Sequence, residues 1–295
     1  VNKNNYLAAG LFIPRIGIIN ENHLPTTFNS VSRPQLERKL IPSTWRELGV
    51  SLYGTFPKIS GLNYSLSLMN GLNSQSFETE NGLREGRFEG RDASAQNLAV
   101  SGSLLYYYKS FRIQFSGYYG GSNCLDKANS DSLGIKSGAF ALPVSMEEFN
   151  IQFRKSGFYS TLLFASVQIP DAPSVDTSYS SYLPELMLGF YAEAGYNILE
   201  KTKFKSKKLN LFVRHESFDL DCRIADNSIL TSNYYQNYTY AGISFLPIPG
   251  VIIKADFEYQ TFRTSSTLTQ NNVTVNTIGN NTHKGFINFG IGYSF

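Results

Sequence analysis

The stretch VIIKADFEYQT, residues 251–261, alternates between apolar and polar side chains from its third residue to its tenth. One parity is apolar: Val251, Ile253, Ala255, Phe257 and Tyr259. The other parity carries Lys254, Asp256, Glu258 and Gln260. Because the side chains of a strand point alternately to its two faces, this stretch predicts a β-strand with one apolar and one polar face.

The same two-residue pattern recurs along the chain. It is clear in FRIQFSGYY (111–119), FNIQFR (149–154), LNLFVRHE (209–216) and the last nine residues, INFGIGYSF (287–295). In all, about twelve segments are predicted to be strands, most of them with this pattern, and no convincing amphipathic helix accompanies them. The sequence therefore predicts an all-β protein.

The composition indicates what the apolar face contacts. Aromatic residues make up 14 % of the 295 residues and charged residues 17 %, while the mean hydropathy is −0.20. Soluble domains usually carry about 25 % charged residues. No apolar run is long enough for a transmembrane helix. The net charge of +3 is too small to predict binding to nucleic acid.

The connections between the predicted strands alternate in length. Short links occur at 57–60, 108–110, 155–157, 199–208 and 246–250, and long polar links at 14–45, 70–94, 121–143, 170–183, 218–233 and 263–282. Short turns at one end and long loops at the other are typical of outer-membrane barrels, whereas the alternative, a soluble β-sandwich, needs no such segregation. We therefore predict one domain over 1–295, an antiparallel up-and-down transmembrane β-barrel that crosses the bacterial outer membrane many times.

The segment GLFIPRIGIINENHLPTTFNSVSRPQLERKLIPSTWRELGVSLYG (10–54) is the most distinctive in the chain. The features that carry a family resemblance are Gly10 with Pro14, GIINENH (17–23), Arg33–Pro34, Glu37, Arg38, IPSTWRELG (41–49), GLNYSLSLMNGL (61–72) and LREGRFEGRD (83–92). Together they resemble the phosphate-selective porin O/P-like group, and more closely its porin-like outer-membrane proteins from Bacteroidetes-type Gram-negative bacteria. Since that group has further strands before this segment, the resemblance implies that the chain is N-terminally shortened and that the intact barrel has about sixteen strands.

In porins, a long loop after an early strand commonly folds into the lumen and forms the constriction. Applied to this chain, the rule makes 14–45 the candidate constriction loop and supplies the candidate selectivity residues: Arg15, Arg33, Glu37, Arg38 and Lys39. Glu21 and Glu37 would oppose or brace the positive charges, and such a ring favours anions weakly. The alternative is that these charges tie the loop to the wall.

A second set of charges lies on the polar face of the predicted strands. It consists of Arg112, Arg154, Glu193, Arg214, Glu216, Lys254, Asp256 and Glu258. We expect these residues to form the lumen wall and to hydrate the pore through cross-strand charge pairs. Trp45 suits an interfacial aromatic girdle, with core packing as the alternative.

The terminal strand ends on an aromatic residue. Phe289, Ile291, Tyr293 and Phe295 share the apolar parity and resemble the C-terminal signal by which outer-membrane proteins are recognised for insertion. Expected partners are therefore membrane lipids, lipopolysaccharide and the barrel assembly machinery, with small hydrophilic solutes in the pore. A homo-oligomer and subunits of an envelope complex stay open.

The function expected from these observations is passive diffusion of small solutes, without enzymatic activity, cofactor or metal. One alternative is a non-conducting barrel that acts as a scaffold for an envelope complex. A remote alternative is an outer-membrane phospholipase-like hydrolase, because His215, Ser217 and Asn237 all have lipid-facing parity. Cys124 and Cys222 both fall in predicted outer loops, where a disulfide and free thiols are equally open.

Overall fold

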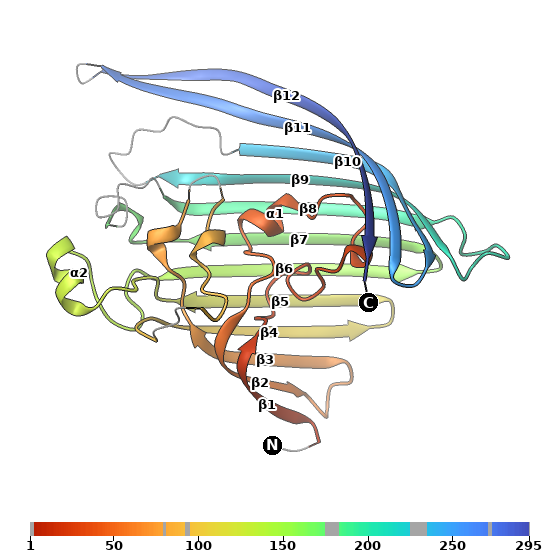
Figure 1. Cartoon of the computed structure of the whole chain (residues 1–295), viewed down its shortest axis with the longest axis horizontal. Helices are drawn as coiled ribbons and strands as arrows, with labels where there is room; N and C mark the ends of the chain where they lie inside the picture. Colours follow the sequence, from red (N-terminus) through yellow and green to blue (C-terminus); the bar gives the residue numbers. More distant parts are fainter. Residues whose placement is uncertain are drawn as a thin grey trace.

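The computed structural model describes residues 3–78, 81–91, 95–174, 183–224, 235–270 and 273–294. Its strands form one sheet in which every strand is hydrogen-bonded to its sequence neighbours, in the order β1 to β12 (Figure 1). The strands are β1 (Asn5–Phe12), β2 (Glu47–Thr55), β3 (Leu62–Asn70), β4 (Leu98–Tyr108), β5 (Phe111–Gly120), β6 (Val144–Lys155), β7 (Phe158–Gln168), β8 (Pro184–Asn197), β9 (Lys208–Ile224), β10 (Tyr235–Ile248), β11 (Val251–Gln270) and β12 (Val273–Tyr293). The all-β, antiparallel, up-and-down arrangement predicted from the sequence is confirmed.

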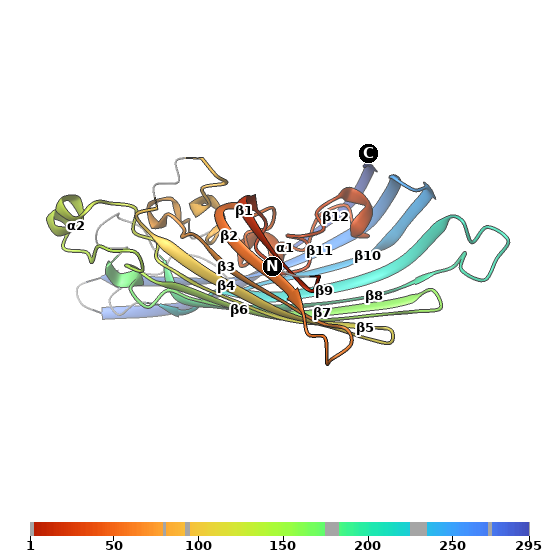
Figure 2. The same ribbon diagram turned by 90° about the horizontal axis from the view of Figure 1, so that it is seen from below.

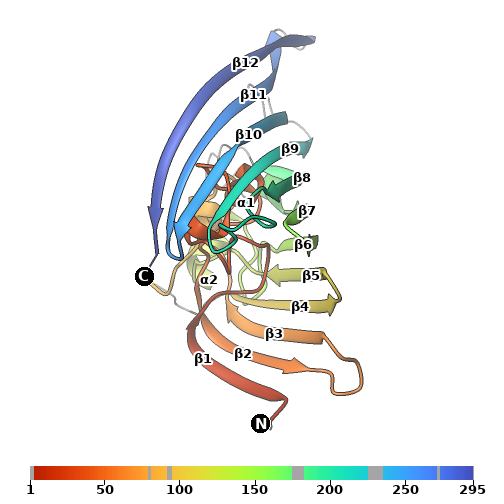
Figure 3. The ribbon, with the colours of Figure 1, turned by 90° about the vertical axis from the view of Figure 1, so that its right-hand side faces the viewer.

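The sheet is strongly curved, with β1 and β12 at its two edges. Seen from its right-hand end, it forms an open arc around a hollow, and β1 and β12 lie at opposite sides of the opening (Figure 3). All eleven strand pairs found in the described ranges join consecutive strands, so these two edges are not paired with each other there. A trough of this kind is the shape that a segment of a barrel wall adopts.

The lengths of the connections follow the predicted alternation, with two corrections. The predicted loop 263–282 is instead a continuation of the β11–β12 hairpin, paired from Arg263↔Asn281 to Gln270↔Val273 across a register shift. The segment is rich in Thr, a residue that favours extended backbone, so the ladder continues. β9 likewise extends to Ile224. The expected loops 70–94, 170–183 and 218–233 lie partly outside the described residues.

The two faces of the sheet differ as the alternation predicts. On the convex face, side chains such as Leu211, Val213, Ile253 and Phe257 are exposed. On the concave face, polar side chains pair across strands: the Ser51 and Ser67 hydroxyls lie 2.7 Å apart, and so do those of Ser65 and Ser103. An apolar outer face around a polar inner face is the arrangement of a membrane barrel.

The long connection between β1 and β2 fills part of the hollow. It carries the short helices η1 (Pro25–Thr27) and α1 (Gln35–Lys39), and Figure 2 shows it on the concave side of the sheet. The remaining helices are η2 (Ser74–Ser76), η3 (Arg84–Gly86) and α2 (Lys127–Leu133). No helix within the described ranges has both the length and the apolar character to cross a bilayer.

An apolar core lies between this connection and the inner face of the sheet. Leu36, Leu40 and Ile41 are fully buried in it. So is Trp45, whose ring packs against Tyr118 at 5.0 Å between centroids. The girdle position expected for Trp45 is therefore wrong, and the core alternative holds, because the connection folds inward and carries Trp45 away from the outer face.

Candidate functional site

The candidate site is the inward-folded segment 13–46, which we call the inner loop, together with the wall residues that contact it. The inner loop turns sharply at Gly17, whose φ of +77° favours glycine. A Cβ at this position would lie 2.7 Å from a carboxylate oxygen of Glu37. The turn and the carboxylate are therefore fitted to each other.

Glu37 of α1 organises the first half of the inner loop. Its Oε2 accepts hydrogen bonds from the backbone N–H groups of Ile18 (2.8 Å) and Ile19 (2.6 Å), and its Oε1 accepts one from the Tyr191 hydroxyl (2.7 Å). Its side chain is fully buried, and this burial raises the pKa of Glu37 to about 7 against the pull of these donors. Glu37 thus braces the loop, as the alternative interpretation of its charge anticipated.

Carboxylates of the wall hold the inner loop from the other side. Glu216 accepts from the Leu36 N–H at 2.9 Å, and Asp256 accepts from the Val31 N–H at 2.5 Å. Glu193 accepts from the Asn29 side chain at 2.9 Å. Three predicted wall residues on β8, β9 and β11 therefore bind the loop.

Cations of the wall also bind the inner loop. Lys254 donates to the Ser30 carbonyl oxygen at 2.9 Å and lies over the ring of Phe28 at 3.5 Å. Arg214 donates to the Ser30 hydroxyl at 2.5 Å and to the Ser32 carbonyl oxygen at 3.3 Å. These contacts join β9 and β11 to the middle of the loop.

Arg214 is the centre of a buried charge cluster. It pairs with Glu193 across β8 and β9 at 3.5 Å and with Glu216 on its own strand at 2.9 Å. A cross-strand pair was expected here, but Arg214 and Glu216 are 0 % exposed under the inner loop and do not hydrate a pore. The sequence predicted that both side chains lie on the polar face of β9, but it did not predict that the inner loop would cover them.

The other predicted charges are distributed over both sides of the hollow. Arg15 and Arg112 both pair with Glu21, at 2.9 and 3.4 Å. Glu258 accepts from the Tyr240 hydroxyl at 3.0 Å. Lys39 donates to the side chain of Gln236 at 3.1 Å.

Arg33 and Arg38 are cations of the inner loop whose contacts within the described ranges are with uncharged groups. In the described ranges neither forms an ion pair; Arg33 donates to the His23 carbonyl oxygen at 3.2 Å, and Arg38, which is exposed, donates to Gln35 at 3.2 Å. Burial, and then the charges of Arg84 and Arg38, lower the pKa of Arg33 below its ordinary value. We call Arg33, Arg38 and Arg84 the basic cluster.

Arg84 was missed by sequence reasoning as a site residue. It lies on η3 in the LREGRFEGRD stretch and donates to the Ser43 carbonyl oxygen at 3.2 Å, as does Arg87 at 2.9 Å. The two arginines are three residues apart, which was a usable signal for a local positive charge. Only the fold brings them to the inner loop.

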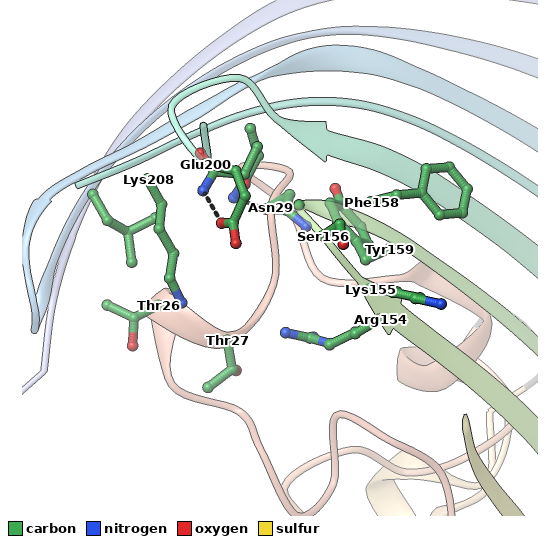
Figure 4. A pocket seen from close by; sticks show the side chains of 14 residues that line it. Thr26, Thr27, Asn29, Arg154, Lys155, Ser156, Phe158, Tyr159, Glu200 and Lys208 are labelled. Carbon is green, nitrogen blue, oxygen red and sulfur yellow. Dashed lines mark hydrogen bonds between the residues drawn. The ribbon is translucent and has the colours of Figure 1, made fainter. Parts of the chain in front are cut away.

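A polar cavity of about 310 Å³ lies at the short-turn end of the hollow (Figure 4). Thr26, Thr27 and Asn29 of the inner loop form one side of it. Figure 4 shows the side chains of Arg154 and Lys208 extending into it from the wall. Neither cation has an ion-pair partner within the described part of the chain. Arg154, one of the predicted wall residues, thus faces open space.

The outer face carries the residues of the hydrolase alternative, but they are not joined to one another. His215 Nδ1 lies 2.9 Å from the Thr239 hydroxyl, and Ser217 donates to the Tyr235 hydroxyl at 3.3 Å. Asn237 is opposite Ser217 in the register of β9 and β10. Among the described residues, no group of three or more His, Cys, Asp or Glu is placed to hold a metal ion.

The remaining predicted residues are placed as follows. Phe289, Ile291 and Tyr293 are strongly exposed on β12, at 77 %, 82 % and 66 %. Phe295 lies outside the described residues. The two cysteines are not joined in a disulfide: Cys124 is half-buried and Cys222 is exposed. The insertion role of the terminal strand stays a prediction.

Sequence comparison finds a relative of uncharacterised function. No family model matches the chain. A protein of uncharacterised function from Aquifex aeolicus is 27 % identical over 263 residues, which are 87 % of this chain; the chain spans only 58 % of that relative's length.

Solved structures extend the comparison. The outer-membrane-expressed OmpT of Vibrio cholerae aligns with 99 % of this chain and 76 % of its own, with a TM-score of 0.52 and 10 % identity. Salmonella typhi OmpF, in a complex with daunomycin, aligns with 91 % of this chain and 68 % of its own, with a TM-score of 0.52 and 11 % identity. The chain therefore has the fold of an outer-membrane β-barrel.

Proposed function

We propose that this chain is the wall and inner loop of an outer-membrane channel through which small hydrophilic solutes diffuse passively, with a weak preference for anions. The observation that carries the proposal is the inner loop. It is fixed to the polar face by Glu37, Glu216 and Asp256, while Arg33 and Arg38 stay without carboxylate partners in the described ranges. Uncompensated guanidinium groups beside a water-filled path attract anions.

The cavity at the turn end agrees with the same function. Arg154 and Lys208 extend into it. Glu200 supplies a carboxylate to the cavity lining, and this carboxylate already accepts a hydrogen bond from the Asn197 side chain at 3.1 Å. A solute moving between the basic cluster and this cavity would meet positive charge at both. Since lipid demands that a barrel have no open edge, we further propose that additional strands pair with β1 and β12 in the membrane, in line with the sixteen expected from the family resemblance.

The test is the reversal potential of the purified protein in planar bilayers under a KCl gradient. The double variant Arg33→Gln/Arg38→Gln is compared with Lys127→Gln/Lys136→Gln, a control on exposed lysines of the β5–β6 connection. We expect the first variant to shift selectivity toward cations and the control to leave it unchanged. An unchanged potential in both would remove the basic cluster from the proposal.

A second candidate is a non-conducting barrel that serves as a scaffold. The dry core of Leu36, Leu40, Ile41 and Trp45 favours it, because these side chains occupy part of the hollow. The same bilayer measurement separates the candidates: single-channel steps support the channel, whereas a silent protein that copurifies with stable subunits supports the scaffold. We retain the expectation that the chain is not an enzyme. His215 and Ser217 bond to Thr239 and Tyr235 and not to each other, which disfavours the hydrolase alternative built on them.

A further inference from the structure

The short-turn end of the sheet carries a concentration of positive charge, most of which the proposed channel does not use. Its connections contribute nine cations: Lys58, Lys109, Arg154, Lys155, Lys201, Lys203, Lys205, Lys207 and Lys208. The same connections, all of them within the described ranges, contain a single carboxylate, Glu200. We call these segments the basic rim (56–61, 109–110, 154–157, 198–208 and 249–250).

The rim segment 198–208, which joins β8 to β9, holds five of these nine cations. In Figure 1 it projects beyond the neighbouring turns at the right-hand end of the sheet. Its backbone is folded into successive turns, for example Lys205 N–H to the Thr202 carbonyl oxygen (3.3 Å) and Lys207 N–H to the Phe204 carbonyl oxygen (2.8 Å). An ordered backbone therefore presents the lysine side chains, all of which are exposed.

A row of exposed aromatic side chains runs along the outer face next to the rim. Tyr108 is paired in register with Phe111, and Phe158 with Tyr196, and all four are exposed. Phe153 joins the row, with ring centroids 4.8 Å from Phe111 and 6.0 Å from Phe158. A band of this kind is typical of the level of a membrane where acyl chains meet headgroups.

The lysines and aromatic residues are directly associated. The Lys109 ammonium lies 5.1 Å from the ring centroid of Tyr108, and that of Lys203 lies 5.2 Å from the ring of Phe204, which is itself exposed. Lys155 is opposite Phe158 on the outer face. A lysine that starts beside an interfacial ring extends its charge to the depth of the lipid phosphates.

We propose that the basic rim binds the phosphate headgroups of anionic phospholipids of the phosphatidylglycerol type, in the leaflet at the short-turn end. Lysines near an anionic surface each contribute a favourable interaction, and the near absence of carboxylates leaves that interaction uncancelled. The proposal depends on the membrane fold and not on conduction, so a silent protein would leave it intact.

The experiment measures lipid retention on the intact chain in detergent by native mass spectrometry. Phosphatidylglycerol and phosphatidylcholine compete in equal amounts, with a lipopolysaccharide arm run in parallel. We expect preferential retention of phosphatidylglycerol that disappears at high salt. The variant Lys201→Gln/Lys203→Gln/Lys205→Gln/Lys207→Gln should reduce that preference by at least roughly fivefold. This lower bound is the factor that a single lysine near an anionic lipid surface contributes.

Two controls make the result specific. The four corresponding Lys→Arg substitutions keep the charge and should keep the preference. Lys127→Gln/Lys136→Gln removes two exposed lysines elsewhere and should also keep the preference for phosphatidylglycerol. Lys203→Gln/Lys205→Gln removes the same number of lysines from the basic rim and should lower the preference. Equal retention of both phospholipids by the parent, or a preference for lipopolysaccharide that survives in the quadruple variant, would overturn the proposal.

Discussion

Glu37 makes docking of the inner loop depend on pH, and the sign follows from its buried position. In the docked loop its pKa is about 7, compared with 4.5 for an exposed glutamate. Between these two values the docked state holds a proton that the undocked state has released, so docking weakens as the pH rises. The slope is about 1.4 kcal/mol for each pH unit, and the loop therefore loses about 3 kcal/mol of docking free energy between pH 4.5 and pH 7.

The groups around Glu37 shift its pKa in opposite directions. Glu148 on β6 accepts from the Gly17 N–H at 3.4 Å and repels an ionised Glu37. Tyr191 on β8 donates to Glu37, as do the N–H groups of Ile18 and Ile19, and these donors favour its ionised form. Burial outweighs them, because it removes water from both carboxylate oxygens.

Trp45 is the probe for this prediction. It is the single tryptophan of the chain and lies fully buried between the inner loop and the wall, so its fluorescence reports loop release. The assay is urea titration in detergent at pH 5 and pH 8, with circular dichroism to follow the sheet separately. We expect the fluorescence midpoint to fall at the higher pH while the sheet remains intact.

The matched variant is Glu37→Gln, which keeps the shape and removes the ionisation. Its midpoint should change less than that of the parent between pH 5 and pH 8, since Glu148 and Glu216 still contact the loop, and at pH 8 it should exceed that of the parent. The reasoning is refuted if Glu37→Gln retains the pH dependence of the parent, or if loop release becomes harder as the pH rises.

Two further predictions concern packing and thiol reactivity. Leu36 is fully buried, and its Cδ1 lies so close to Gly189 that a Cβ there would clash with it. Leu36→Ala should therefore reduce docking by about 2–5 kcal/mol in the same Trp45 assay, with the sheet signal unchanged. A loss below 1 kcal/mol would show that α1 is not held by this contact. Burial raises the pKa of Cys124 to about 11, so at pH 8 maleimide should modify Cys222 well before Cys124, and equal rates of labelling at the two thiols would contradict the structure.

Local pattern accounts for most of the fold. The alternation in residues 253–260 predicts which side chains of β11 face outward, because the two faces of a strand follow from sequence parity alone. The hairpins at 109–110 and 156–157 are equally local features. The sequence did not predict the part of the β11–β12 hairpin beyond Arg263. Its Thr and Asn residues are polar, and polar residues indicate a loop when the strand that pairs with them is not considered.

The inner loop shows where the sequence stopped being sufficient. The analogy with porins, in which a long loop after an early strand enters the lumen, predicted a loop in the hollow. Arg33, Glu37 and Arg38 nevertheless have different environments although they are close in sequence. Glu37 is 0 % exposed and Arg38 is exposed, because α1 places one side chain against β8 and leaves the other outward. Sequence spacing on a helix does not say which face will be covered until its partner is known.

The sequence by itself determined the strand order, the apolar outer face and the polar inner face, since each depends on residues that are close in the chain. Only the tertiary structure decided that Glu193, Arg214, Glu216 and Asp256 bind the inner loop. It also brought Arg84 into the basic cluster. These contacts join residues up to 225 positions apart, and their formation depends on the desolvation and hydrogen bonding that arise when the loop closes over the wall.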